Sequence, residues 1–287
     1  MKIDVVDVQK SDAPRRFARS LHETGFAVLV NHPIPFDVVQ RVWTEWLGFF
    51  KSEAKWEFAQ NSGEQDGYRS LEGSELAVGA KVKDIKEYFH FYPWGRCPAD
   101  LKESASLLFS SGAFLARTLL SWVEDESPLS VKEGFSMPLP NMLDDSHRTL
   151  LRILHYPPLK GDEPEGAVRA AAHEDINLLT VLPASNEPGL QVQSLDGSWF
   201  DVPCDPGSIA VNAGDMLAMA SGGFFPSTTH RVLNPPSSSE NRSRCSTPLF
   251  LHPADDVVLS VKDGKPYRAF DFLDDRLRAI TGDGLLR

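Results

Sequence analysis

Two side chains with metal-binding chemistry, His173 and Asp175, lie two residues apart in the apolar stretch AAHEDINLLTVL. The stretch is rich in apolar and β-branched residues, so we predict one strand over Ala171–Leu182, with both side chains on the same side of it. An imidazole and a carboxylate directed to one point suit a two-His, one-carboxylate Fe(II) site. The pair alone is weak evidence, because 40 acidic residues in 287 give the eight histidines about one such pair by chance. The alternative is a strand histidine bonded to a backbone carbonyl.

A third ligand and an anion-binding pair are available further along the chain. His230 lies in the strand-like segment TTHRV, and we predict it as the third ligand. Arg244 and Ser246 follow, again two apart on a predicted strand. A buried guanidinium beside a hydroxyl is costly unless it meets an anion, and the fork of an arginine suits a carboxylate. Arg242 would lie on the same side of this strand, but the hydroxyl two residues after Arg244 favours Arg244 as the anion-binding arginine.

The elements that must position these residues change in character after Leu150. Short apolar or alternating runs, divided by Gly, Pro, Asp and Ser, predict a two-sheet jelly roll or barrel. Tight turns are expected at Asn212–Asp215 and at Asp196-Gly197. The predicted strands are Leu151–Tyr156, Ala171–Leu182, Leu190–Gln193, Trp199–Val202, Ser208–Asn212, Asp215–Ala220, Thr228–Leu233 and Arg244–His252.

The amino-terminal half mixes strands and amphipathic helices. Apolar spacing at three and four residues predicts the helices, of which the first is expected to be capped by Ser11. We predict strands at Ile3–Val6, Phe26–Val30 and Ile85–Tyr92, and helices at Ser11–Glu23, Pro35–Lys51, Asp100–Glu124 and, at the other end of the chain, Phe270–Ile280. The expected organisation is an amino-terminal α/β segment (1–145), a β core (146–260) and a C-terminal helix packed on it (261–287).

Composition narrows the classes of function. A net charge of −11 and a pI of about 5.2 argue against nucleic-acid binding, which depends on Lys and Arg contacts to phosphate. No apolar run approaches the ~20 residues of a membrane span, and MKIDVVDVQKSDAPRR lacks an apolar signal core. Cys97, Cys204 and Cys245 are odd in number and widely spaced, which favours reduced thiols. We therefore expect a cytoplasmic globular protein that binds neither nucleic acid nor a membrane.

Several stretches of the sequence, including those around His173, His230 and Arg244, resemble one family, the isopenicillin N synthase-like Fe(II)/2-oxoglutarate-dependent dioxygenases. The resemblance extends from about Ile3 to Asp255. It is carried by IDVVDV, ETGFAVLVNHPIP, KDIKEYFHF, HEDINLLTVL, GLQVQSLDGSWFDVPCDPGSIAVNAGD, STTHRVLNPP and RCSTPLFLHP.

This resemblance implies a double-stranded β-helix core in which His173, Asp175 and His230 hold Fe(II). It further implies that 2-oxoglutarate chelates the iron while its far carboxylate binds Arg244 and Ser246. Tyr156, in HYPP, matches a family tyrosine that often donates to the same carboxylate; the alternative is a core aromatic. The implied reaction consumes O₂ and 2-oxoglutarate, hydroxylates a small molecule and releases succinate and CO₂.

Two other functions stay open on the sequence. One is an Fe(II) oxidase of the same fold that takes all its electrons from the substrate, since Arg-x-Ser also occurs in one such group. The other is a cupin-like metal-binding protein without redox turnover. The chain also departs from the family, because Leu154 stands where many plant members have Asn and the stretch between His230 and Arg244 is longer.

Overall fold

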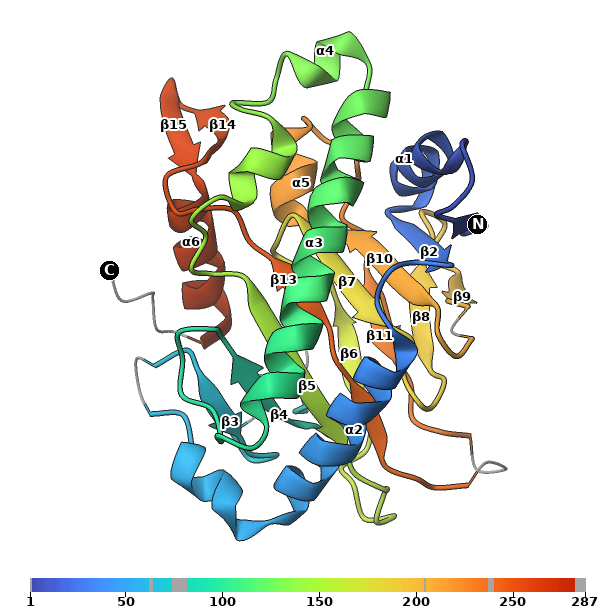
Figure 1. Ribbon diagram of the computed structural model, residues 1–287, viewed down its shortest axis with the longest axis vertical. Coiled ribbons are helices and arrows are strands. Elements are labelled where there is room, and N and C mark those ends of the chain that lie inside the picture. The colour runs from blue at the N-terminus through green and yellow to red at the C-terminus, as the bar shows by residue number, and fades with distance from the viewer. Residues whose placement is uncertain (1, 62–63, 74–81, 204, 237–239, 282–287) are drawn as a thin grey trace.

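The computed structural model describes every residue except 1, 62–63, 74–81, 204, 237–239 and 282–287 (Figure 1). Its centre is a nine-stranded mixed sheet and a four-stranded sheet. The larger sheet runs β1 (Val5–Asp7), β2 (Phe26–Val30), β10 (Ile209–Ala213), β7 (Leu179–Pro183), β13 (Leu249–Leu251), β5 (Leu150–Tyr156), β4 (Glu87–Phe91) and β3 (Gly67–Arg69), with β12 (Arg244–Ser246) also paired to β5. The smaller sheet runs β6 (Ala170–His173), β11 (His230–Val232), β8 (Leu190–Gln193) and β9 (Trp199–Asp201).

The two sheets pack face to face through apolar side chains, as the predicted jelly roll requires. Strand β2 shows the principle, because its sequence FAVLV is apolar on both faces. Phe26 and Val28 pack against residues of the smaller sheet such as Val192, whereas Ala27 and Leu29 belong to the helix-side core. The prediction of a strand covered on both sides is confirmed here, as is the predicted fold class.

Helices cover the outer face of the larger sheet (Figure 1). Three long ones contribute to the main core, and α3 contacts β7 and β13 as well as the other two. They are α1 (Ala13–Thr24), α2 (Phe36–Lys51) and α3 (Lys102–Glu126), all close to the predicted ranges. The shorter elements are α4 (Leu129–Lys132), α5 (Asp215–Ala220), α6 (Ala269–Thr281), two 3-10 helices (Glu53–Phe58 and Leu139–Leu143) and a hairpin of β14 (Val258–Lys262) with β15 (Lys265–Arg268).

Among the described residues, α3 is the helix whose length and apolar composition match those of a membrane span. One side of it is nevertheless buried in the protein, with Leu108, Leu115 and Leu119 in the main core. A core helix meets the same two criteria, so these properties of α3 follow from packing inside the fold.

The prediction of one strand over Ala171–Leu182 is wrong, because this segment forms two strands that belong to different sheets. Strand β6 ends at His173 in the smaller sheet, and β7 begins at Leu179 in the larger one. The predicted strand Arg244–His252 is also divided, into β12 and β13, on either side of Thr247-Pro248. Proline has no amide hydrogen for a ladder, which explains the interruption.

Two other local predictions are wrong. Asp215–Ala220 forms helix α5 instead of a strand, and its sequence DMLAMA consists mainly of good helix formers. The expected turn at Asn212–Asp215 is therefore the entry to that helix. Helix α1 is capped at Asp12 and not at Ser11, with Pro14 in its first turn. The turn at Asp196-Gly197 between β8 and β9 is confirmed by the Gly197 φ of 85°.

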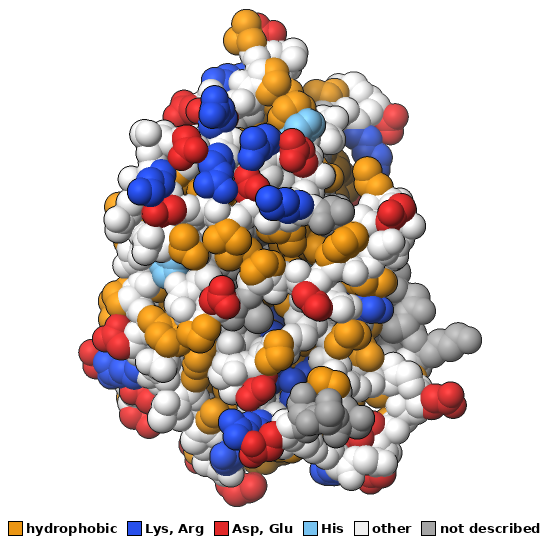
Figure 2. All heavy atoms as spheres, turned by 90° about the vertical axis from the view of Figure 1, so that its right-hand side faces the viewer, with side chains coloured by type: hydrophobic (Ala, Val, Ile, Leu, Met, Phe, Trp, Pro, Cys, Tyr) orange, Lys and Arg blue, Asp and Glu red, His pale blue; other side chains and the backbone are white. Residues whose placement is uncertain are grey.

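The amino-terminal segment and the β core share one sheet. Strand β2 pairs with β10, and β4 pairs with β5, so strands from residues 1–145 extend both edges of the core sheet. The predicted three-part organisation describes the order along the chain, and the hydrogen bonding joins its first two parts. Figure 2 shows acidic and basic side chains intermingled over the face that it presents.

Candidate metal centre

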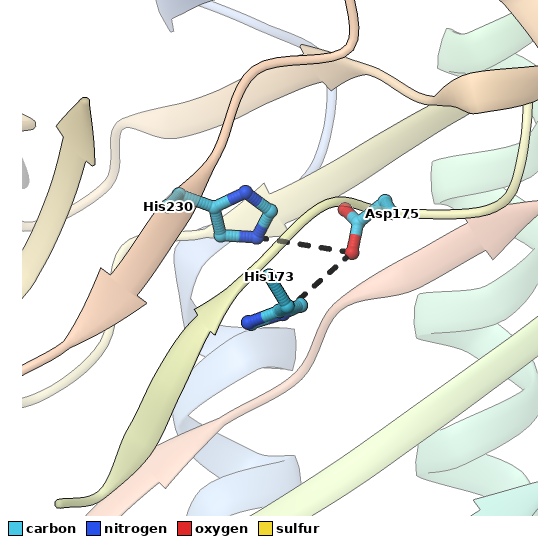
Figure 3. A group of neighbouring side chains, drawn as sticks. All are labelled: His173, Asp175 and His230. Carbon is cyan, nitrogen blue, oxygen red and sulfur yellow. Dashed lines mark ion pairs between the residues drawn. The ribbon is translucent and has the colours of Figure 1, made fainter. Parts of the chain in front are cut away.

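The three predicted ligands converge at one end of the smaller sheet (Figure 3). His173 is the last residue of β6 and His230 the first of β11, and the two are direct partners in the ladder. Their ring centroids lie 4.4 Å apart. Asp175 Oδ1 lies 3.9 Å from His173 Nε2 and 3.7 Å from His230 Nε2. The three potential ligand atoms, one from each residue, all lie within 4.8 Å of one another.

Asp175 reaches this point from a turn and not from a strand. The turn after β6 docks on the start of α5, where the Asp215 amide donates to the Asp175 carbonyl at 2.8 Å. A Cβ at Gly214 would lie 2.2 Å from the Asn177 carbonyl oxygen, so only glycine permits this approach. The sequence AGD, which resembled a hairpin turn, thus shapes the backbone that carries the carboxylate.

Hydrogen bonds orient all three donors. His173 Nδ1 lies 2.7 Å from the Ala171 carbonyl oxygen, and His230 Nδ1 lies 3.1 Å from that of Thr228. Because a carbonyl only accepts, each Nδ1 carries the hydrogen, and each Nε2 keeps a lone pair for a metal. The carbonyl partner expected under the alternative for His173 is therefore present, and it is compatible with ligation because it engages only Nδ1.

Two residues of the larger sheet hold the carboxylate. Asp175 Oδ2 accepts hydrogen bonds from Thr180 Oγ1 at 2.5 Å and from Asn212 Nδ2 at 2.8 Å, which leaves Oδ1 directed at the imidazoles. Neither residue was predicted from the sequence to lie at the site. A usable signal existed, because each is a single polar residue in an otherwise apolar strand, in LTVLP and IAVNA.

The electrostatics favour the metal-binding protonation states of His173 and Asp175. Burial and repulsion from His230 lower the pKa of His173 to about 4, so this imidazole is neutral at pH 7. Burial raises the pKa of Asp175, but its attraction to both imidazoles and its hydrogen bonds outweigh that effect and hold the pKa below the usual value. Two imidazole nitrogens and one carboxylate are the donor set of a facial triad.

The predicted anion-binding residues meet on the inner face of the larger sheet. In β12, Arg244 pairs with Tyr156 of β5 and Ser246 pairs with Leu154. Leu151 and Ile153 of β5 belong to the helix-side core, so alternation directs Leu154 and Tyr156 to the inner face. The same alternation in β7 places Thr180, which bonds Asp175, on that face.

Arg244, Ser246 and Tyr156 are all nearly inaccessible to solvent. The Arg244 guanidinium carbon lies 5.1 Å from the centroid of the Tyr156 ring, and its Nε donates to the Glu187 carbonyl oxygen at 3.0 Å. Arg242 behaves differently, because its side chain is exposed and pairs with Glu240. The structure thus places Arg244 and not Arg242 inside the fold.

Neither described cysteine belongs to the group of candidate metal donors. Cys245 alternates with Arg244 and Ser246 in β12 and is part of the helix-side core. Cys97 and Cys245 are free thiols, and burial raises the pKa of each to about 12. Cys204 lies outside the described residues.

Comparison with known proteins gives consistent matches along the chain. The model of the 2OG-Fe(II) oxygenase superfamily matches residues 148–253, and that of the non-haem dioxygenase in morphine synthesis N-terminal family matches residues 3–106. The rice (Oryza sativa subsp. japonica) protein 2-oxoglutarate-dependent dioxygenase 11 is 28% identical over 96% of this chain and 80% of its own length.

Solved structures of similar proteins agree. A protein of Shewanella oneidensis assigned as an oxygenase is 55% identical, with a TM-score of 0.86, over 97% of this chain and 98% of its own. A full-length Neurospora crassa protein crystallised in complex with alpha-KG is 26% identical, with a TM-score of 0.80, over 96% of this chain and 95% of its own.

Proposed function

The chain belongs to the 2OG-Fe(II) oxygenase superfamily, and on that premise we propose that His173, Asp175 and His230 bind its iron. The observation that carries the proposal is the convergence of three donor atoms within 4.8 Å, each fixed by hydrogen bonds through its other polar atom. The protein is an Fe(II)- and 2-oxoglutarate-dependent dioxygenase, an oxidoreductase.

The donor set fits a ferrous ion. Both imidazoles present Nε2, the carboxylate presents Oδ1, and the carbonyl oxygens behind the imidazoles set their tautomers. Iron and 2-oxoglutarate, when bound, supply O₂ activation and the oxidation of a substrate C–H bond, with release of succinate and CO₂. The residues of this chain orient and retain the ion: Asn212 and Thr180 hold Asp175 in place from the opposite sheet.

We propose that Arg244 and Ser246 bind the far carboxylate of 2-oxoglutarate, with Tyr156 beside them. A guanidinium and two hydroxyl groups facing the sheet interior offer a charge and several donors to an anion. The planar fork of the Arg244 guanidinium would bind both oxygens of that carboxylate. This step positions the co-substrate and involves no transfer of a proton by these residues.

We propose hydroxylation of a small molecule as the reaction. Asp175 and His230 are buried, whereas the His173 side chain is 38% exposed, so the centre opens to solvent at the His173 edge. A substrate would approach there. A thermal-shift screen of small molecules on the anaerobic Fe(II)/2-oxoglutarate protein would identify candidates, because a true substrate stabilises the form that it binds.

Turnover with such a candidate tests the reaction class. We expect succinate to form in proportion to substrate consumed and a hydroxylated product to appear. Substrate oxidation with O₂ uptake but without succinate would contradict the proposal and favour an oxidase that does not use 2-oxoglutarate. Metal retention without O₂ uptake would favour a binding protein.

We also propose a cytoplasmic location. The free thiols of Cys97 and Cys245 support it, because reducing compartments keep thiols unpaired. Fractionation of the native host, with detection of the protein by antibody, would test this location.

A further inference from the structure

A second buried arginine, Arg169, lies directly before the strand that carries the first metal ligand. Its backbone is held on both sides, because the Val168 carbonyl accepts from the Ile85 amide at 2.9 Å and the Ala171 amide donates to Asp84 Oδ1 at 2.9 Å. Arg169 is therefore fixed in a short segment that begins β6. No sequence pattern had singled out this residue.

The Arg169 side chain is buried, and Glu187, whose negative charge acts to raise its pKa, forms no ion pair with it. Only 1% of the residue is exposed. Nη2 donates to the Arg242 carbonyl oxygen at 3.0 Å, but the buried Nε has no hydrogen-bond partner. Within the part of the chain that the structure describes, no carboxylate lies within ion-pairing distance of it. A buried donor and charge left in this state cost free energy, and arginine cannot escape the cost by losing its proton.

Arg169 shares its surroundings with Arg244. The guanidinium carbons lie 6.0 Å and 5.1 Å from the centroid of the same Tyr156 ring. Burial and repulsion from Arg244 lower the pKa of Arg169, which reflects two positive groups confined together. Two guanidinium groups beside one tyrosine, with the buried Nε of Arg169 lacking a hydrogen-bond partner, indicate a place where an anion could bind.

We propose that Arg169 is a second cationic residue for the far carboxylate of 2-oxoglutarate, acting beside Arg244 at Tyr156. The inference rests on the proposed binding of that carboxylate by Arg244 and Ser246. The free Nε of Arg169 is the donor available to the anion, while Nη2 stays on the Arg242 carbonyl. The role is one of binding and selectivity: a dicarboxylic oxo-acid is favoured over a monocarboxylic one.

A pair of oxo-acids of equal chain length tests this role. 2-Oxoglutarate and 2-oxopentanoate share the chelating end, and only the first has a far carboxylate. Both would be titrated into the anaerobic Fe(II)-loaded protein, with the metal-to-ligand charge-transfer absorption as the measure of binding. For Arg169→Met we expect the Kd of 2-oxoglutarate to rise about tenfold or more and that of 2-oxopentanoate to stay within about twofold.

Two further variants serve as controls for the Arg169→Met titrations. Arg242→Met removes an exposed guanidinium that pairs with Glu240 but keeps the backbone carbonyl that Arg169 uses, so both Kd values should match the wild type. Arg169→Lys keeps the charge without the fork and should fall between Met and Arg. The ligand-free Arg169→Met protein should melt no lower than the wild type, since a repelled buried charge is removed.

Failure of the Arg169 proposal can be distinguished from failure of the proposed carboxylate site. Equal weakening of both oxo-acids, together with a lower melting temperature, would assign Arg169 to packing alone and overturn the proposal. Unchanged binding of 2-oxoglutarate by Arg169→Met would overturn it as well. If the wild-type protein itself failed to bind 2-oxoglutarate, the fault would lie in the proposed carboxylate site as a whole.

Discussion

Neighbouring residues of β5 belong to two buried polar clusters with opposite properties. His155 faces the helices, where its Nδ1 lies 2.7 Å from Glu87 Oε1. Glu87 also accepts from Tyr68 at 2.5 Å and from Lys55 at 3.0 Å, so we call these four residues the closed cluster. Tyr156 faces the inside of the jelly roll with Arg169 and Arg244, and we call these three the open cluster.

The difference lies in charge balance. The closed cluster contains its own anion and cation, and its hydrogen bonds join α2, the segment after it, β3, β4 and β5. The open cluster contains two guanidinium groups and no carboxylate, and we propose that the co-substrate carboxylate binds there. Buried charge that is balanced within the chain serves stability, whereas buried charge of one sign indicates a ligand.

Removing a metal ligand should give the largest effect. We expect His230→Ala to weaken Fe(II) binding by more than about 100-fold and to abolish turnover. This loss is larger than that expected when a residue that only hydrogen-bonds to a ligand is replaced. Calorimetric titration with Fe(II) under nitrogen would measure it. His155→Ala is the matched control from the closed cluster: it should bind iron normally while unfolding at a lower temperature.

Arg244→Met should weaken the binding of 2-oxoglutarate and leave the binding of Fe(II) unchanged. If the Arg244 guanidinium binds the far carboxylate as proposed, its loss is expected to cost about 2–3 kcal/mol of binding, or roughly 30- to 150-fold in the Kd of 2-oxoglutarate. Fe(II) affinity without co-substrate should be unchanged. Normal 2-oxoglutarate binding in this variant would remove the open cluster from the co-substrate site.

The hydrogen bonds behind Asp175 should have an intermediate effect. Asn212→Leu removes the Nδ2 donor from Oδ2, and we expect Fe(II) affinity to fall by about 10-fold. Thr180→Val removes the other donor and should act similarly. If Fe(II) affinity were unaffected in both variants, orientation of the carboxylate by the larger sheet would be unimportant.

Glu87→Gln should alter stability alone. Burial raises the pKa of Glu87, but hydrogen bonds from His155, Tyr68 and Lys55 outweigh burial and hold the pKa below its ordinary value of 4.5. The carboxylate therefore stabilises the fold above about pH 4.5, and this contribution is lost as the pH falls through the lower folded value. We expect a loss of about 2 kcal/mol at pH 7 that shrinks on acidification, measured by urea unfolding. A loss independent of pH would contradict the charge assignment.

The sequence predicted residue types and strand runs better than it predicted how the chain turns between them. The convergence of His173, Asp175 and His230 was predicted from their spacing and their chemistry. The supposed strand through the first two was wrong, because the docking of residues 174–178 on α5 depends on contacts with Gly214 that are distant in sequence. The ligands converge for a tertiary reason and not through strand alternation.

Other features differ in how much local signal they carry. Asp263-Gly264, both with positive φ, form the turn of β14 and β15, and this Asp-Gly pair could have been recognised. Arg169 offered no such signal, since a lone arginine before an apolar strand acquires meaning only when Arg244 and Tyr156 are brought beside it.

The central claim is that the ends of β6 and β11 and the turn after β6 form one ferrous site. Anomalous diffraction at the iron edge, on crystals grown anaerobically with Fe(II), tests it most directly. We predict a single peak at bonding distance, about 2.0–2.3 Å, from His173 Nε2, His230 Nε2 and Asp175 Oδ1. Iron bound elsewhere, or a peak that one of these three side chains does not contact, would contradict the account.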